Sequence, residues 1–124
     1  MWRDLVIAFR VDSSLNIGSG HVMRCLTMAD HLKAKGARCH FISRMHPGNL
    51  LQLIRKRGFD ITTLPGELSN LGCHWQIDAE QTRSVLLSLK PDWLVVDHYG
   101  LDHHWEATLL PNLQKLIVID DLAD

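Results

Sequence analysis

The segment FRVDSSLNIGSGHVMRCL, from Phe9 to Leu26, organises the rest of the chain. The apolar run from Leu5 to Phe9 predicts a buried strand, and a small polar loop from Ser13 to Gly20 follows it. A helical pattern then begins, with His21 in its first turn. Because a helix start has free N–H groups and a partial positive charge, this order predicts a place for an anion or a reacting oxygen.

The rest of the chain alternates apolar runs with helical patterns. Further strands are expected at residues 39–43, 59–64, 93–97 and 116–119. Helices are expected at residues 21–35, from residue 50 through a basic end before Gly58, at 78–89 and at 103–110, with a loop at 65–75. Basic residues followed by Gly36 and Gly58 predict the ends of the first two helices. Helical connections between apolar strands predict an α/β fold, a Rossmann-like parallel sheet with helices on both faces, as one domain over residues 1–124.

The composition is that of an ordinary globular domain, with 46% hydrophobic and 22% charged residues. A formal net charge of -1 gives no general attraction to nucleic acid or to an anionic membrane. No apolar run approaches the roughly 20 residues that span a bilayer, and Met1 to Asp4 lead into a strand without the features of a secretory signal. The cysteines, Cys25, Cys39 and Cys73, form no paired spacing, so we expect no disulfide framework and a reducing, cytoplasmic location.

Polar segments follow three of the expected strands, at residues 10–21, 97–100 and 120–121. In open parallel sheets, ligands bind beyond the carboxyl ends of the strands, near the point where the strand order reverses. Gly18 and Gly20 allow a ligand close to the backbone, and the N–H groups from Gly20 to Arg24 can bind a phosphate or a sugar oxygen. The segment is neither a G-x-G-x-x-G motif nor a Walker loop, so an ordinary turn is an equal alternative.

His21 adds an ionisable group to the first of these segments. The helix dipole disfavours a charged imidazolium at a helix N-terminus, and a neutral imidazole can act as a general base toward water. The alternative is a polar residue that forms only local hydrogen bonds. Asp97, His98 and Tyr99, with His103 and His104 nearby, suit polar contacts to a sugar and, equally, the capping of a strand end.

No metal-ligand spacing such as H-E-x-x-H accompanies these histidines and carboxylates, so we expect no metal and no cofactor. Asp120 and Asp121 are compatible with a cation, with capping of the last strand or with a contact to an arginine of the first segment. Among the tryptophans, Trp75 in the expected loop is the candidate for ligand contact, whereas Trp93 and Trp105 are expected in the core.

Three motifs carry a resemblance to a known family: RVDSSLNIGSGHVMRCLTMA at residues 10–29, VVDHYGLD at 95–102 and VIDDLAD at 118–124. In this order and at this spacing they resemble the nucleotide-sugar hydrolases of pseudaminic acid synthesis. These are the UDP-2,4-diacetamido-2,4,6-trideoxy-β-L-altropyranose hydrolases, together with the related spore-coat polysaccharide proteins. The resemblance extends over the whole chain.

The resemblance implies a GT-B-like, two-domain fold in which this chain is the N-terminal, acceptor-side domain and the C-terminal nucleotide-binding domain is absent from it. It also implies hydrolysis of a UDP-linked amino sugar at the C1–O bond, with inversion and without a metal, to release UDP and free sugar. His21 would deprotonate the attacking water. The residues that would shape the site and bind the substrate are Arg10, Asp12, Ser14, Gly18, Gly20, Arg24, His98 and Tyr99.

Two other functions are compatible with the sequence. One is a non-catalytic domain that binds a sugar or docks a partner domain, and the other is a GT-B glycosyltransferase that uses a hydroxyl group as acceptor. We expect little or no activity from these 124 residues alone. An apolar face left by a missing domain would favour self-association.

Overall fold

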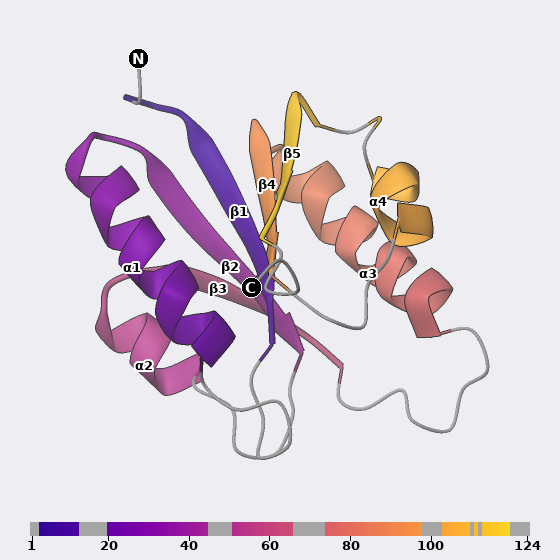
Figure 1. Ribbon diagram of the computed structural model, residues 1–124, viewed down its shortest axis with the longest axis horizontal. Helices are drawn as coiled ribbons and strands as arrows, with labels where there is room; N and C mark the ends of the chain where they lie inside the picture. Colours follow the sequence, from indigo (N-terminus) through magenta and orange to yellow (C-terminus); the bar gives the residue numbers. More distant parts are fainter. Residues whose placement is uncertain are drawn as a thin grey trace.

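The computed structural model describes residues 3–12, 20–44, 51–65, 74–97, 103–109, 111 and 113–119, without the side chains of residues 21, 74 and 103. Strands and helices alternate as β1 (Val6–Val11), α1 (Gly20–Ala34), β2 (Arg38–Arg44), α2 (Leu51–Lys56), β3 (Asp60–Leu64), α3 (His74–Leu89), β4 (Trp93–Asp97), α4 (His103–Leu109) and β5 (Lys115–Val118). The strands form one five-stranded, all-parallel sheet in the order β3-β2-β1-β4-β5 (Figure 1). The predicted α/β, Rossmann-like fold is confirmed.

The helices cover both faces of the sheet, with α1 and α2 on one face and α3 and α4 on the other (Figure 1). Each face has its own apolar core, because successive strand residues point to opposite sides of a sheet. The core under α1 and α2 includes Phe9 of β1 and Phe41 of β2, whose rings stack 5.0 Å apart. The core under α3 and α4 includes Ala8, Ile42 and the fully buried Trp105. Burial on both faces explains why β1 is almost continuously apolar.

The predicted ends of the first two helices are confirmed. Gly36 follows α1 with a φ of 102°, and Gly58 follows α2 with a φ of 90°. A positive φ of this kind strains any residue that carries a Cβ, so glycine suits both positions. The basic residues Arg55 and Lys56 lie in the last turn of α2, where cations complement the helix dipole.

Several predicted boundaries differ from those of the structure, among them the end of β1 and the start of α3 at the carboxyl edge of the sheet. β1 continues through Arg10 and Val11 instead of ending at Phe9, because buried carboxylates compensate the charge of Arg10 within the strand. α3 begins at His74 instead of Asp78, so Trp75 belongs to a helix and not to a loop. The first turn of α3 lacks the apolar period that marks the rest of the helix, which hid its start.

Several predictions about buried residues can be checked directly. Trp105 is fully buried, as predicted, whereas Trp93 is only partly buried against the core under α1 and α2. Cys25 and Cys39 are buried free thiols. Cys73 lies outside the described residues. Within the described ranges, no helix is long and apolar enough to cross a membrane.

Candidate functional site

The point where the strand order reverses lies between β1 and β4. β1 pairs with β2 on one side and with β4 on the other, and its register places Val11 beside Asp97 at the carboxyl edge. The helix that follows β1 crosses to one face of the sheet, and the helix that follows β4 crosses to the other (Figure 1). Such a reversal opens a crevice above the strand ends, where doubly wound proteins bind their ligands.

Arg24 and Asp97 join the start of α1 to the end of β4. The Nε and Nη2 groups of Arg24 donate to the two carboxylate oxygens of Asp97 at 2.8 and 2.7 Å. The side chain of Asp97 is 1% exposed and that of Arg24 is 36% exposed, so the pair extends from the protein interior to its surface. The Cys25 thiol lies 3.8 Å from the same carboxylate. Burial and the charge of Asp97 raise the pKa of this thiol, which keeps it protonated.

Gly20 begins α1 and is exposed. Its φ is not positive, and a Cβ added to it would meet nothing within 4 Å beyond its chain neighbours and its own helix. Neither backbone strain nor crowding among the described residues therefore requires a glycine here. A glycine at a helix start does allow a ligand to lie directly against the backbone N–H groups.

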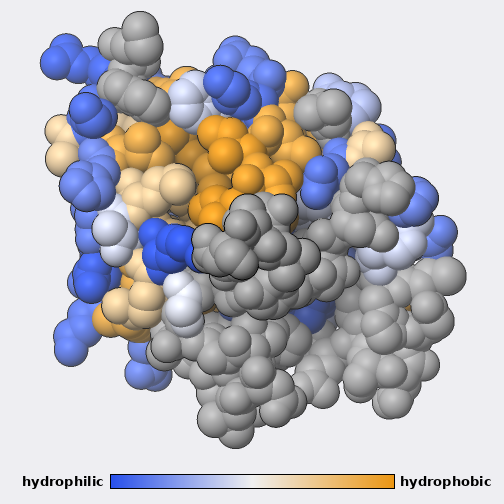
Figure 2. Space-filling model, in the orientation of Figure 1, coloured by the Kyte–Doolittle hydropathy of each residue, from blue (hydrophilic) through white to orange (hydrophobic). Residues whose placement is uncertain are grey.

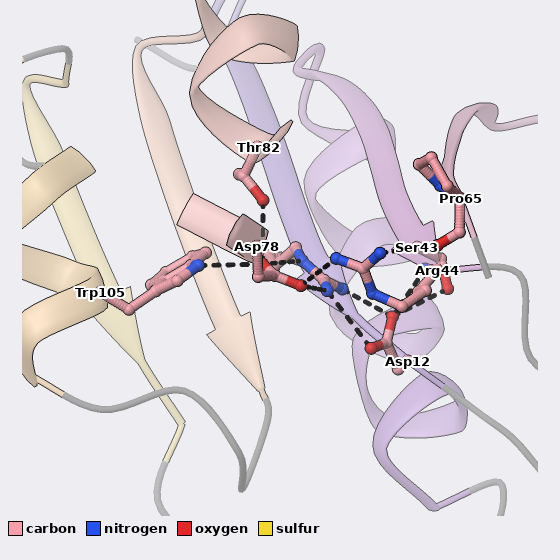
Figure 3. Close-up of polar contacts among 8 residues, drawn as sticks. Asp12, Ser43, Arg44, Pro65, Asp78, Thr82 and Trp105 are labelled. Carbon is pink, nitrogen blue, oxygen red and sulfur yellow. Dashed lines mark hydrogen bonds and ion pairs between the residues drawn. The ribbon is translucent and has the colours of Figure 1, made fainter. Parts of the chain in front are cut away.

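A second group of charges lies beneath the carboxyl edge, on the face that α3 and α4 cover (Figure 3). Arg10 donates to Asp12 at 2.6 Å and to Asp78 of α3 at 2.5 Å. Arg44, the last residue of β2, donates from its side chain to Asp78 at 2.5 Å and from its backbone N–H to Asp12 at 2.7 Å. We call Arg10, Asp12, Arg44 and Asp78 the buried charge cluster. Its two positive and two negative charges balance, as burial of ionised groups demands.

Neutral side chains add further hydrogen bonds to the buried charge cluster (Figure 3). Asp78 accepts the indole N–H of Trp105 at 2.9 Å and the hydroxyl of Thr82 at 3.2 Å. The Ser43 hydroxyl donates to Asp12 at 3.4 Å. The cluster therefore connects β1, β2, α3 and α4 immediately under the carboxyl edge.

The opposite charges in this cluster favour the ionised forms of Arg10 and Asp78. Burial alone raises the pKa of Asp78, but the charges and hydrogen bonds of Arg10 and Arg44 outweigh it, and the pKa is lowered. Burial alone lowers the pKa of Arg10, and the carboxylates of Asp12 and Asp78 raise it by more. Both groups therefore stay ionised at neutral pH.

The structure separates the predicted substrate-binding residues into three sets. Arg10 and Asp12 are 0% and 2% exposed, so Arg10 braces the end of β1 from below and has no surface to offer a ligand. Gly20 and Arg24 lie at the carboxyl edge itself. The remaining predictions, namely Ser14, Gly18, His98, Tyr99, the side chain of His21, and the pair Asp120 and Asp121, fall outside the described residues.

Trp75, predicted as a ligand contact, packs against a neighbouring aromatic ring. Its indole stacks on the imidazole of His104 with the ring centroids 5.4 Å apart. Trp75 lies in the first turn of α3 and His104 in the first turn of α4, and both helices begin on the carboxyl side of the sheet. The contact of Trp75 with a ligand stays a prediction.

The sequence patterns did not predict Arg44 and Asp78 as residues of the site. A signal for Asp78 was present, because Asp78, Thr82 and Leu86 recur at intervals of four and so form one stripe of α3. All three are buried. Arg44 has no comparable signal, since it follows an apolar strand at the position where an exposed loop was expected.

A hollow of about 310 Å³ lies at the opposite, amino edge of the sheet, lined among others by Lys33, Arg38, Cys39 and Asp60. Ligands of parallel sheets bind at the carboxyl edge, so we do not assign the hollow a function. Across the described ranges, His, Cys, Asp and Glu side chains form no group of three or more that could hold a metal ion.

Comparisons with known proteins add no further assignment. No family model matches the chain, and no curated protein is significantly similar to it. The grounds for a functional proposal are therefore the motifs, the fold and the geometry of the carboxyl edge.

Proposed function

We propose that the chain is the acceptor-side domain of a cytoplasmic nucleotide-sugar hydrolase that cleaves a UDP-linked amino sugar into UDP and free sugar. The resemblance of the three motifs supplies the substrate class. The observation that carries the proposal is Gly20, an exposed glycine at the start of α1 that neither backbone strain nor crowding by the described residues explains. A substrate lying against the helix start would explain it, because any Cβ would then occupy the space of the substrate.

In this mechanism His21 takes a proton from a water molecule as the water oxygen bonds to C1 of the sugar. The C1–O bond to UDP breaks from the opposite side, so the configuration at C1 inverts and the bonding electron pair leaves on the diphosphate oxygen. The N–H groups at the start of α1 and the cationic side chain of Arg24 stabilise the negative charge that develops there. Positioning of the water and this preformed electrostatic environment lower the barrier, and the reaction needs no metal.

The buried charge cluster has a supporting part in this proposal. Arg10 and Asp12 hold the end of β1, from which the polar segment of the first motif departs. Their burial assigns them to the support of the site and leaves direct contact with the sugar to the predicted residues at the edge, His98 and Tyr99 among them.

The test is the substitution His21→Asn in the complete product of the gene. We expect turnover, measured as release of UDP from a UDP-linked amino sugar, to fall by about 10²- to 10⁴-fold, which is the usual contribution of a general base. Binding of the UDP-sugar, measured by calorimetry, should change by less than about threefold, because the base acts mainly in the transition state.

His31→Asn is the matched control, because His31 is an exposed histidine in the last turn of the same helix. It should leave turnover and binding unchanged. Unchanged turnover in His21→Asn would falsify the mechanism. Analysis of the products separates the remaining alternatives, since free sugar identifies a hydrolase, a glycoside identifies a transferase, and binding without turnover identifies a non-catalytic domain.

A further inference from the structure

Asp97 is a buried carboxylate that the proposed mechanism does not use. It is the last residue of β4, and its side chain is 1% exposed. Loss of hydration strongly destabilises a carboxylate at this depth unless a cation and hydrogen bonds replace the water. Arg24 supplies two hydrogen bonds and a positive charge.

Arg24, which binds Asp97, lies near the start of α1. Arg24 is separated by one helical turn from Gly20, and in an α-helix the N–H of residue 24 donates to the carbonyl of residue 20. Arg24 and Asp97 are 73 residues apart in the chain, so their contact ties the start of α1 to a different strand. The tie crosses the reversal of strand order between β1 and β4, where the site is proposed.

The geometry of the Arg24–Asp97 pair fixes both the distance and the relative orientation of the two side chains. The Nε and Nη2 groups of Arg24 engage both oxygens of Asp97, a planar, two-point contact that a single hydrogen bond cannot reproduce. The apolar residues Val22, Cys25 and Leu26 hold α1 against the sheet. Apolar packing does not specify the orientation of a polar helix start, whereas a two-point ion pair does.

We infer that Asp97 is a positioning residue for the proposed hydrolysis, which acts through Arg24 to hold the first turn of α1 at the crevice. The inference rests on the proposed function in one respect, namely that the first turn of α1 meets the substrate. It assigns Arg24 to the positioning of the site in addition to the charge that it contributes there. A displacement of a reacting group by about 1 Å can cost about 10²-fold in rate, so the hold on this turn matters for turnover.

The first test is a double-mutant cycle on turnover in the complete product of the gene. Asp97→Asn keeps the shape of the side chain and removes its charge, and it should lower kcat at least about tenfold with the dissociation constant of the UDP-sugar changed less than about threefold. Arg24→Gln should lower kcat at least as much, because it also removes the positive charge near the leaving diphosphate, and the double variant should be no worse than Arg24→Gln, because the Arg24–Asp97 contact is already lost there. Additive losses would overturn the inference and indicate independent roles for the two residues.

Conservative and control variants separate positioning from loss of folding. Arg24→Lys keeps the charge but not the two-point contact, and it should recover only part of the lost kcat. Asp30→Asn breaks the exposed ion pair of the same helix with Arg57 and should leave kcat unchanged. All assays are run well below the Tm of each variant, so that the folded protein is what is compared. Wild-type kcat in Asp97→Asn would overturn the inference.

Hydrogen exchange distinguishes a failure of this inference from a failure of the proposed function. If Asp97 holds the first turn, the N–H groups of Arg24 and Cys25 should exchange at least about tenfold faster in Asp97→Asn, because local opening becomes easier. Exchange at the far end of α1, at Ala29 for example, should not change. If the wild-type protein shows no turnover, the proposed function fails and this inference loses its catalytic part. Unchanged exchange at Arg24 and Cys25 overturns the positioning itself, whatever the turnover.

Discussion

Near the carboxyl edge, arginine–aspartate contacts lie on both faces of the sheet, and the contacts on the two faces differ in their exposure to solvent. Under α3 and α4, the four members of the buried charge cluster are at most 4% exposed. Under α1, Asp97 is equally buried, but its partner Arg24 is 36% exposed. The same residue types thus form a closed group on one face of the sheet (Figure 3) and a pair that reaches the surface on the other.

Because of this difference in exposure, we expect the loss of a charge to have different consequences on the two faces. A closed group cannot recruit water when one member is removed, so the remaining charges stay uncompensated in the interior. In the open pair, the long side chain of Arg24 can turn toward solvent when Asp97 is neutralised. We therefore expect the closed group to govern the free energy of unfolding and the open pair to govern events at the surface of the carboxyl edge.

Neutralising Asp78 gives the largest expected effect on stability. Asp78→Asn leaves Arg10 and Arg44 in excess of Asp12 in a closed interior, and it should reduce the free energy of unfolding by about 3–5 kcal/mol. Asp97→Asn should cost less, about 1–3 kcal/mol, because it removes one of the two hydrogen bonds and the ionic part of the other, and the exposed Arg24 can be rehydrated.

Urea denaturation of the two variants and the wild type at neutral pH measures both values. The slope of the transition should be the same in all three proteins, since the surface exposed on unfolding is unchanged. An equal loss of unfolding free energy in Asp78→Asn and Asp97→Asn would contradict this expectation. The closed group would then contribute no more to stability than the pair with an exposed arginine.

Acid should remove the contribution of Asp78 progressively. Its folded-state pKa is lowered below the ordinary 3.8, since Arg10 and Arg44 outweigh the effect of burial. The stability that this carboxylate contributes is therefore complete above the ordinary pKa, and it is lost as the pH falls below about 4 through the folded-state pKa. The difference in unfolding free energy between the wild type and Asp78→Asn should be constant from pH 7 to 5 and shrink below pH 4.

Urea denaturation at a series of pH values tests this dependence. Glu80→Gln is the control, because Glu80 is an exposed carboxylate on the same helix. Its contact with Arg83 is long, at 3.7 Å. This variant should differ from the wild type by less than about 0.5 kcal/mol at every pH, as surface substitutions usually do. A difference for Asp78→Asn that grows on acidification would contradict the assigned direction of the pKa.

The fold could be predicted from the sequence because its signals are local. The apolar run of β4 gives the bounds 93–97 correctly, since proline and polar residues limit it on both sides. Glycine and basic residues likewise give the ends of α1 and α2. These signals depend on a few neighbouring residues, and the alternation of strand and helix then leaves few possible topologies.

The contacts of the site could be predicted only in part. The topology indicates that the end of β1, the start of α1 and the end of β4 meet, and the pairing of Arg24 with Asp97 agrees with it. The burial of Arg10 could not be read from the sequence, because its partner Asp78 is 68 residues away and a charged residue at a strand end reads as the beginning of a loop. Hydropathy patterns register a charge but not the opposite charge that accompanies it across the fold.

Of the three ion pairs compared, the smallest expected effect on stability comes from the one in which both side chains are exposed. Arg57 donates to Asp30 at 2.7 Å, a distance like those of the other pairs, but the two side chains are 40% and 47% exposed. Arg57→Gln should therefore cost only about 0–1 kcal/mol, and the loss should fall further when salt screens the pair. Urea denaturation at low and high salt measures both effects. The contacts of Asp78, Asp97 and Arg57 are of similar length but differ in exposure and in the number of hydrogen bonds, so the ranking tests the combined effect of burial and hydrogen bonding. A cost for Arg57→Gln that equals the cost for Asp97→Asn would show that the half-buried pair owes its strength to something other than its buried carboxylate.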